Sequence, residues 1–105
     1  MKRLLVHIDS LVTDIATSFV EAAARRNIDV ALIHPIGAAP AAPDGLVEVL
    51  QLPALDLESL RAALRDLDTR YEVAALSCHF GPYREDGFLA GHVAALREER
   101  GLAGP

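Results

Sequence analysis

The chain has 105 residues, of which 51% are apolar, with a formal net charge of -5 and a single cysteine. This length suits one domain with one core, and a net negative charge with arginines mixed among carboxylates argues against a nucleic-acid-binding surface. No apolar run approaches the roughly 20 residues of a membrane-spanning helix, and MKRLLVHID turns polar too soon for a signal peptide, so we expect a cytoplasmic protein.

The first part of the chain predicts a strand, a helix and a second strand. RLLVHI, Arg3 to Ile8, is an apolar run typical of a buried strand. Apolar residues then recur at helical spacing from Val12 to Ala23, and Asn27 is expected to end that helix. The apolar run from Ile28 to Pro35 predicts a second strand. The three elements form a βαβ unit with a right-handed crossover.

The middle of the chain predicts a loop and a strand at the edge of the sheet. Alanine, proline and glycine dominate the segment from Ile36 to Gly45, which has no apolar period and is expected to be a surface loop. The next segment, Leu46 to Pro53, predicts a short strand. Its polar residues Glu48 and Gln51 indicate that this strand is solvated and lies at an edge.

A second helix is indicated by one narrow apolar stripe. Asp56 is expected to cap it, and two ion pairs are expected on its wet side, Asp66 with Arg70 and Glu58 with Arg61. The stripe repeats at steps of 3 and 4 through Leu57, Leu60, Leu64, Leu67 and Tyr71.

The end of the chain predicts a strand, a polar loop and a helix. Glu72 to Cys78 is expected to be a buried strand, and SCHFGPYREDG follows from Ser77. Gly101 is expected to cap the last helix, with Leu102 folding back on its final turn. The apolar face of this helix comprises Phe88, Leu89, His92, Val93 and Leu96.

These elements predict an α/β fold over residues 1–105: a small Rossmann-like, open, mainly parallel sheet of about four strands with helices on both faces. Ligands bind such sheets beyond the carboxyl ends of the strands, where the strand order reverses. The loops after the first and the last strands are therefore the important ones. The first loop, HIDSLVTD, contains no glycine, so it has neither a dinucleotide fingerprint nor a P-loop.

One alternative for the first loop is a receiver-like pocket that holds magnesium and an aspartyl phosphate. Asp9, Ser10 and Asp14 supply its polar groups. That pocket also needs a later aspartate and a lysine late in the chain, whereas the only lysine is Lys2. A free-standing small-molecule-binding or receiver-like regulatory module therefore stays open as the second hypothesis.

The histidines and the cysteine raise the hypothesis of a metal site. No pair has a common ligand spacing, and Cys78 and His79 are adjacent on a strand end, where they point to opposite faces. We expect His7 to pack beneath a helix, His92 to lie at the rim of the core and Cys78 to act as a small apolar residue. The sequence therefore predicts neither a metal site nor a catalytic residue.

The loop after the last strand has two interpretations. In the structural one, Glu85 or Asp86 caps the amides of the last helix. In the functional one, Tyr83 or Arg84 orients a substrate carboxylate at the edge of the sheet.

With the elements in this order, the chain resembles the N-terminal domain of ATP-grasp ligases, the pre-ATP-grasp or biotin-carboxylase N-domain-like fold. The resemblance covers essentially the whole chain. It is carried by the helix-to-strand step LRDLDTRYEVAALS and by the ending LREERGLAGP, which is similar to the family's A...A..LGLPGP.

The resemblance implies part of an enzyme that activates a carboxylate as an acyl phosphate and passes it to an amine. ATP and magnesium would be held by catalytic subdomains absent from this chain, so the chain itself would hold no cofactor and would be inactive alone. Its partners would be those ATP-grasp domains, in cis or in trans, and the isolated chain is expected to form a homodimer. The implied substrate-cleft residues are Asp9, Ser10, His79, Tyr83, Arg84 and Glu85.

Overall fold

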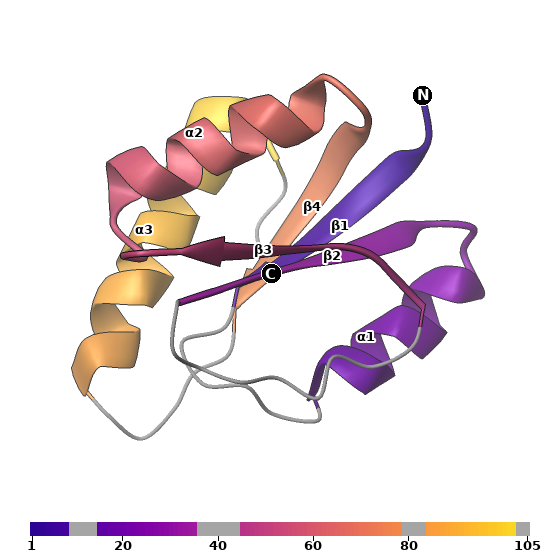
Figure 1. Ribbon diagram of the computed structural model, residues 1–105, viewed down its shortest axis with the longest axis horizontal. Helices are drawn as coiled ribbons and strands as arrows, with labels where there is room; N and C mark the ends of the chain where they lie inside the picture. Colours follow the sequence, from indigo (N-terminus) through magenta and orange to yellow (C-terminus); the bar gives the residue numbers. More distant parts are fainter. Residues whose placement is uncertain (9–14, 36–44, 79–83, 103–105) are drawn as a thin grey trace.

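The structure is a computed structural model (Figure 1). Its backbone is described for residues 1–8, 15–35, 45–78 and 84–102, and its side chains for residues 1–8, 20–35, 45–78 and 89–102. The elements in chain order are β1 (Arg3–Ile8), α1 (Ile15–Ala24), β2 (Asp29–Pro35), β3 (Leu46–Leu52), α2 (Leu57–Asp68), β4 (Glu72–Cys78) and α3 (Arg84–Arg100).

The four strands form one parallel sheet in the order β3-β2-β1-β4. Helix α1 lies on one face, and α2 and α3 lie together on the other (Figure 1). The predicted fold class, a small Rossmann-like parallel sheet with helices on both faces, is therefore confirmed. The order matches that of the first four strands of a Rossmann sheet, 3-2-1-4, and differs from the 2-1-3-4-5 order of flavodoxin-like folds.

The main core lies between the sheet and the helices α2 and α3. Alternate residues of the central strands enter it, because side chains of a strand point to opposite faces in turn. From β1 these are Leu4, Val6 and Ile8, all with no exposed surface, and Ala31 and Ile33 join them from β2. Both central strands are buried on both faces, which explains their continuous apolar sequences.

Strand β3 is an edge strand, as its polar residues predicted. Its side chains alternate between half-buried and exposed. Leu50 and Leu52 pack against the core, whereas Val47 and Val49 point to the other face and are 39% and 40% exposed. Helix α1 packs chiefly against β2, and the two valines remain partly exposed.

Helix α2 begins as the sequence predicts but ends sooner. The Asp56 side chain accepts a hydrogen bond from the Ser59 backbone N–H at 2.7 Å, which confirms the cap. The helix ends at Asp68 and is closed by Thr69, so the prediction that Tyr71 continues the helical stripe is wrong. Tyr71 still packs against the core, because the chain turns there towards β4. The buried stripe is Leu60, Ala63, Leu64 and Leu67.

Helix α3 begins earlier than its apolar stripe indicates. Its first residue is Arg84, and its backbone runs through Gly87 without a break. The prediction that Glu85 or Asp86 caps this helix is therefore wrong, since both lie inside its first turn, where acidic residues complement the positive end of the helix dipole. At the other end, Gly101 has a φ of +67° and the Leu102 N–H donates to the Arg97 carbonyl at 2.9 Å. The predicted glycine cap is thus confirmed.

Both ion pairs predicted on α2 are present and extend to other elements. Arg70 Nη2 lies 3.0 Å from an Asp66 oxygen and 2.7 Å from Glu48 Oε1 on β3. Arg61 pairs with Glu58 and also contacts Glu99 of α3 at 2.6 Å. The two arginines therefore tie α2 to an edge strand on one side and to a neighbouring helix on the other.

We expect the Glu48–Arg70 pair to make stability depend on pH. Hydrogen bonds from Arg70 and Tyr71 hold the pKa of the Glu48 carboxyl below its ordinary value. A lowered pKa in the folded state stabilises above the unfolded value of about 4.3, and this stabilisation is lost as the pH falls through the folded pKa. In urea unfolding, Glu48→Gln should cost about 0.5–1 kcal/mol at pH 7 and progressively less towards pH 3.

Glu98→Gln is the matched control for Glu48→Gln, because Glu98 is exposed on α3 and makes no ion pair with any described residue. Its effect should be close to zero at every pH. A cost for Glu48→Gln that stayed constant from pH 7 to pH 3 would show that packing, rather than the charge, is responsible.

Gly45 is the residue that allows the chain to enter β3 close to α1. Its φ is +97°, and a Cβ atom there would lie 2.8 Å from Cγ1 of Val20. Gly45→Ala should lower the free energy of unfolding by about 1–2 kcal/mol through backbone strain alone, and by more if Val20 cannot move. Gly91→Ala should instead raise it by about 0.5–1 kcal/mol, since Gly91 lies inside α3 with open space around its Cα. Equal effects of the two changes in thermal unfolding would contradict this account.

Candidate functional site

The candidate site lies where the central strand β1 runs beside the edge strand β4. From β1 the chain proceeds to β2 on one side, while β4 adds on the other, so the strand order reverses between them. Because all strands are parallel, their carboxyl ends lie at one edge of the sheet, where α1 and α3 also begin (Figure 1). In open parallel sheets this edge, at such a reversal, is where ligands bind.

A buried hydrogen-bonded pair lies between β1 and β4 at this edge. His7 has no exposed surface, and its Nδ1 is 2.9 Å from the hydroxyl oxygen of Ser77. The two residues are direct neighbours in the strand register and lie on the α1 face, because Val6 and Ile8 point into the other core. The prediction that His7 packs beneath a helix agrees with its complete burial on the α1 face of the sheet. Its partner Ser77 was not identified from sequence, since it lies 70 residues away along the chain.

A second buried histidine, His34, lies on the same face of the neighbouring strand β2. Its Nδ1 is 3.0 Å from the carbonyl oxygen of Pro35. A carbonyl can only accept a hydrogen bond, so Nδ1 carries the proton and Nε2 of the neutral ring presents a lone pair. Nε2 is buried and has no hydrogen-bond partner within the described part of the chain. The ring can therefore accept one more hydrogen bond.

Cys78 and His92 are not part of this arrangement. Cys78 is half-buried and packs against the core of the α2 and α3 face, one residue beyond Ser77. His92 is half-buried on α3, at the rim position that its spacing indicates. Within the described ranges, no three histidine, cysteine or carboxylate side chains come close enough together to hold a metal ion.

The residues that the resemblance assigns to a substrate cleft follow β1 and β4 in the sequence. Asp9, Ser10, His79 and Tyr83 lie outside the described residues. The other two assigned positions, Arg84 and Glu85, form the start of α3, and their side chains also lie outside the described set. The described part of the site therefore consists of His7, Ser77 and His34, each of which lies near the carboxyl end of its strand.

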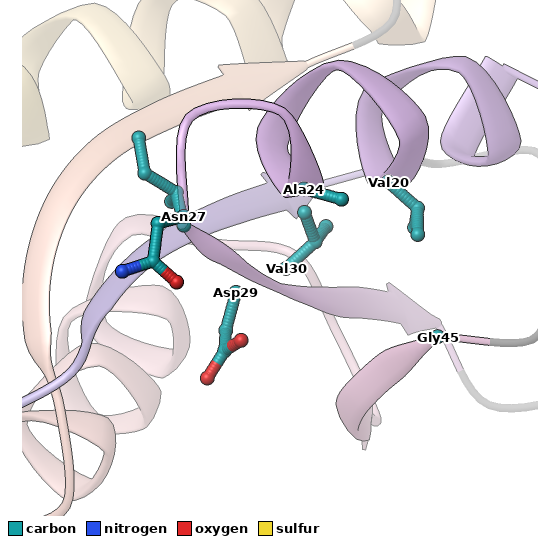
Figure 2. Close-up of a pocket in the computed structure, with 7 residues that line it drawn as sticks. Val20, Ala24, Asn27, Asp29, Val30 and Gly45 are labelled. Carbon is teal, nitrogen blue, oxygen red and sulfur yellow. The ribbon is translucent and has the colours of Figure 1, made fainter.

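A separate pocket of about 280 Å³ lies near the amino end of β2 (Figure 2). Val20 and Ala24 of α1 and Val30 of β2 line its apolar part, and the carboxylate of Asp29 points away from α1. At the polar end, Lys2 donates to the side-chain oxygen of Asn27 at 2.9 Å and lies 4.0 Å from Asp29. Because these polar groups already have partners, we interpret this pocket as a gap in the packing around Gly45.

No family model matches the chain, and no curated protein matches it. The fold and the edge described above therefore define the class, an α/β protein with a Rossmann-like four-stranded parallel sheet. None of its described helices combines the length and the hydrophobicity needed to cross a membrane.

Proposed function

We propose that this chain is the substrate-cleft domain of an ATP-grasp-type ligase that joins a carboxylate to an amine. The observation that supports the proposal most is the His7–Ser77 pair, buried beside the reversal of strand order. The Ser77 hydroxyl is half-buried and keeps hydrogen-bonding capacity beyond its bond to His7, at the edge where such sheets bind ligands. The chain would thus contribute recognition of the substrate, and the chemistry would take place on a partner.

The proposed reaction has two steps. A substrate carboxylate oxygen attacks the γ-phosphorus of ATP and ADP leaves, which gives an acyl phosphate. An amine nitrogen then attacks the acyl carbon and phosphate leaves. The glycine-free first loop HIDSLVTD cannot bring its backbone close to a nucleotide phosphate in the manner of a P-loop. We therefore assign ATP and magnesium to the catalytic domains.

The exposed apolar side chains of β3 support the proposal that a partner binds this chain. Val47 and Val49 lie side by side on one face of an edge strand and remain partly exposed. Exposed apolar surface at a sheet edge favours association. We assign it to contact with the catalytic domains, and in their absence we expect the isolated chain to form a homodimer, detectable by sedimentation. Val49→Lys should return such a dimer to a monomer.

The decisive experiment traps the acyl phosphate. The tagged chain is isolated with its native partners and incubated with ATP, a panel of carboxylates and hydroxylamine, which converts an acyl phosphate to a hydroxamate. We expect ADP and a hydroxamate from one carboxylate with the complex, and neither from the chain alone. Ser77→Ala should raise the KM for that carboxylate, whereas the control Arg65→Gln, on the exposed side of α2, should leave it unchanged. A chain that isolates without any ATP-utilising partner would contradict the proposal.

The strand order bears on the alternative of a free-standing module. Receivers have the 2-1-3-4-5 order, in which the third strand lies next to the first. Here β3 lies beyond β2 and β4 occupies the place beside β1. The order therefore favours a small-molecule-binding module over a receiver as the second candidate. Such a module would bind its ligand without any partner, which the isolation experiment also detects.

A further inference from the structure

A groove of about 410 Å³ lies on the α1 face of the sheet, towards the amino ends of β1 and β4. Leu5 and Ala75, which are neighbours in the strand register, form its apolar floor. Residues from the second half of α1 and the turn after it form one wall. The complete lining is Arg3, Leu5, Ala22, Ala23, Arg26, Ile28 and Ala75.

The groove exists because α1 covers only part of this face. The helix packs chiefly against β2, whereas α2 and α3 contact β4 from the opposite face. On the α1 side, β4 carries only a small side chain, Ala75, next to Leu5. The helix also presents small side chains, Ala22 and Ala23, towards the groove. The lining is therefore mostly apolar and of a size within the range of small-molecule sites.

Two guanidinium groups that have no partner among the described side chains lie at this groove. Arg3 and Arg26 are exposed, and neither forms an ion pair or a side-chain hydrogen bond with a described residue. Glu72 is the register neighbour of Arg3, yet no ion pair joins them. The contrast with Arg61, Arg70 and Arg100 is clear, because each of these is paired with carboxylates.

The carboxyl end of α1 does not repel an anion bound in the groove. The helix C-terminus carries partial negative charge on its last carbonyl groups. Here the Ala23 carbonyl accepts hydrogen bonds from the backbone N–H groups of Arg26 and Ile28, and the Ala24 carbonyl accepts one from Asn27. These carbonyls are satisfied within the turn, so the two guanidinium groups determine the charge preference of the groove.

We propose that this groove binds a small apolar carboxylate, with its hydrocarbon part on Leu5 and Ala75 and its carboxylate between Arg3 and Arg26. Guanidinium groups bind carboxylates through paired hydrogen bonds, which gives this charge a specific recognition. The apolar floor selects against small polar anions. The groove lies towards the amino ends of the strands, whereas the His7–Ser77 pair lies at the carboxyl edge, so it is a second site, independent of the proposed ligase function.

The test uses the full chain labelled with ¹⁵N and titrated with octanoate, with 1-octanol and octylamine as matched neutral and cationic probes. We expect saturable amide shifts at Leu5, Ala23 and Ala75 with octanoate, binding of octanol weaker by about tenfold or more, and no saturable shift with octylamine. Arg26→Gln should weaken octanoate binding about tenfold, and the double change Arg3→Gln with Arg26→Gln about a hundredfold.

Two further variants serve as controls for the octanoate experiment. Arg65→Gln removes an equally exposed arginine from α2 and should leave octanoate binding within about twofold. Ala75→Leu fills the floor of the groove and should abolish saturable binding while the far-UV circular dichroism stays unchanged. Equal affinity for octanol and octanoate, or unchanged binding in the double arginine variant, would overturn the proposal. A dimer whose interface contains these amides, and which octanoate does not dissociate, would also overturn the proposal.

Discussion

Replacing Leu64 with alanine is expected to lower the free energy of unfolding by about 3 kcal/mol. Leu64 is 1% exposed and lies in the middle of the α2 stripe, within the core that α2, α3 and the sheet share. The loss combines the transfer free energy of the deleted carbons with the cost of the cavity that remains. A domain of this size has a total stability of roughly 5–15 kcal/mol, so the change removes a large fraction of it. Urea unfolding followed by circular dichroism measures the effect.

Arg65→Ala is the matched control for Leu64→Ala, because the next residue of the same helix is exposed. Its effect should stay within about 0.5 kcal/mol. A loss below about 1 kcal/mol for Leu64→Ala would mean that α2 does not pack on the sheet as the structure describes.

Arg97→Ala is expected to have the second largest effect, about 2 kcal/mol of unfolding free energy together with stronger self-association. The half-buried Arg97 guanidinium donates two hydrogen bonds, of 3.1 and 2.6 Å, to the backbone carbonyl of Leu76. Leu76 belongs to β4, an edge strand, and hydrogen bonds from a charged donor contribute about 1.5–3 kcal/mol. Without Arg97 this carbonyl is open to a strand from another molecule. Chemical unfolding and sedimentation velocity measure the two effects.

Arg100→Ala gives the comparison within the same helix. Arg100 Nη1 lies 3.0 Å from a carboxylate oxygen of the half-buried Asp68, and ion pairs that keep contact with water contribute about 0–1 kcal/mol. The two arginines thus differ mainly in what they bind. If Arg97→Ala cost no more than Arg100→Ala and left the sedimentation coefficient unchanged, Arg97 would have no role in protecting the edge.

The order and type of the elements could be predicted from the sequence because the apolar runs are short and bounded by polar residues. The bounds of β1 and β4 match the predicted ranges, since Asp9 and His79 interrupt the apolar pattern directly after each strand. Helix ends were less predictable. Tyr71 falls at helical spacing although the chain has already turned, and the apolar face that begins at Phe88 indicated a later start for α3 than the backbone has. The spacing of apolar residues indicates which residues are buried, but it does not indicate where a helix begins or ends.

The candidate site could be located from the sequence only as an edge of the sheet. The pairing of His7 with Ser77 depends on the register between β1 and β4, and that register shifts between Leu4 and Leu5. No local sequence pattern records such a shift. The lone pair on His34 likewise follows from the position of the Pro35 carbonyl, which only the folded backbone defines. The arginine groove depends on which strands α1 covers, and this is also a property of the assembled sheet.

The position of β1 in the sheet also sets the order in which the protein can assemble. β1 is made first, and it can pair early with β2, because only α1 separates them. Its other side must wait for β4, whose residues pair with it from about 70 positions further along the chain. Until then a strand whose Leu4, Val6 and Ile8 are completely buried in the finished fold has an open side, and closing so long a loop is slow compared with forming a helix. Synthesis therefore leaves an incomplete sheet until β4 arrives, and that step completes the sheet and reduces its exposure to aggregation.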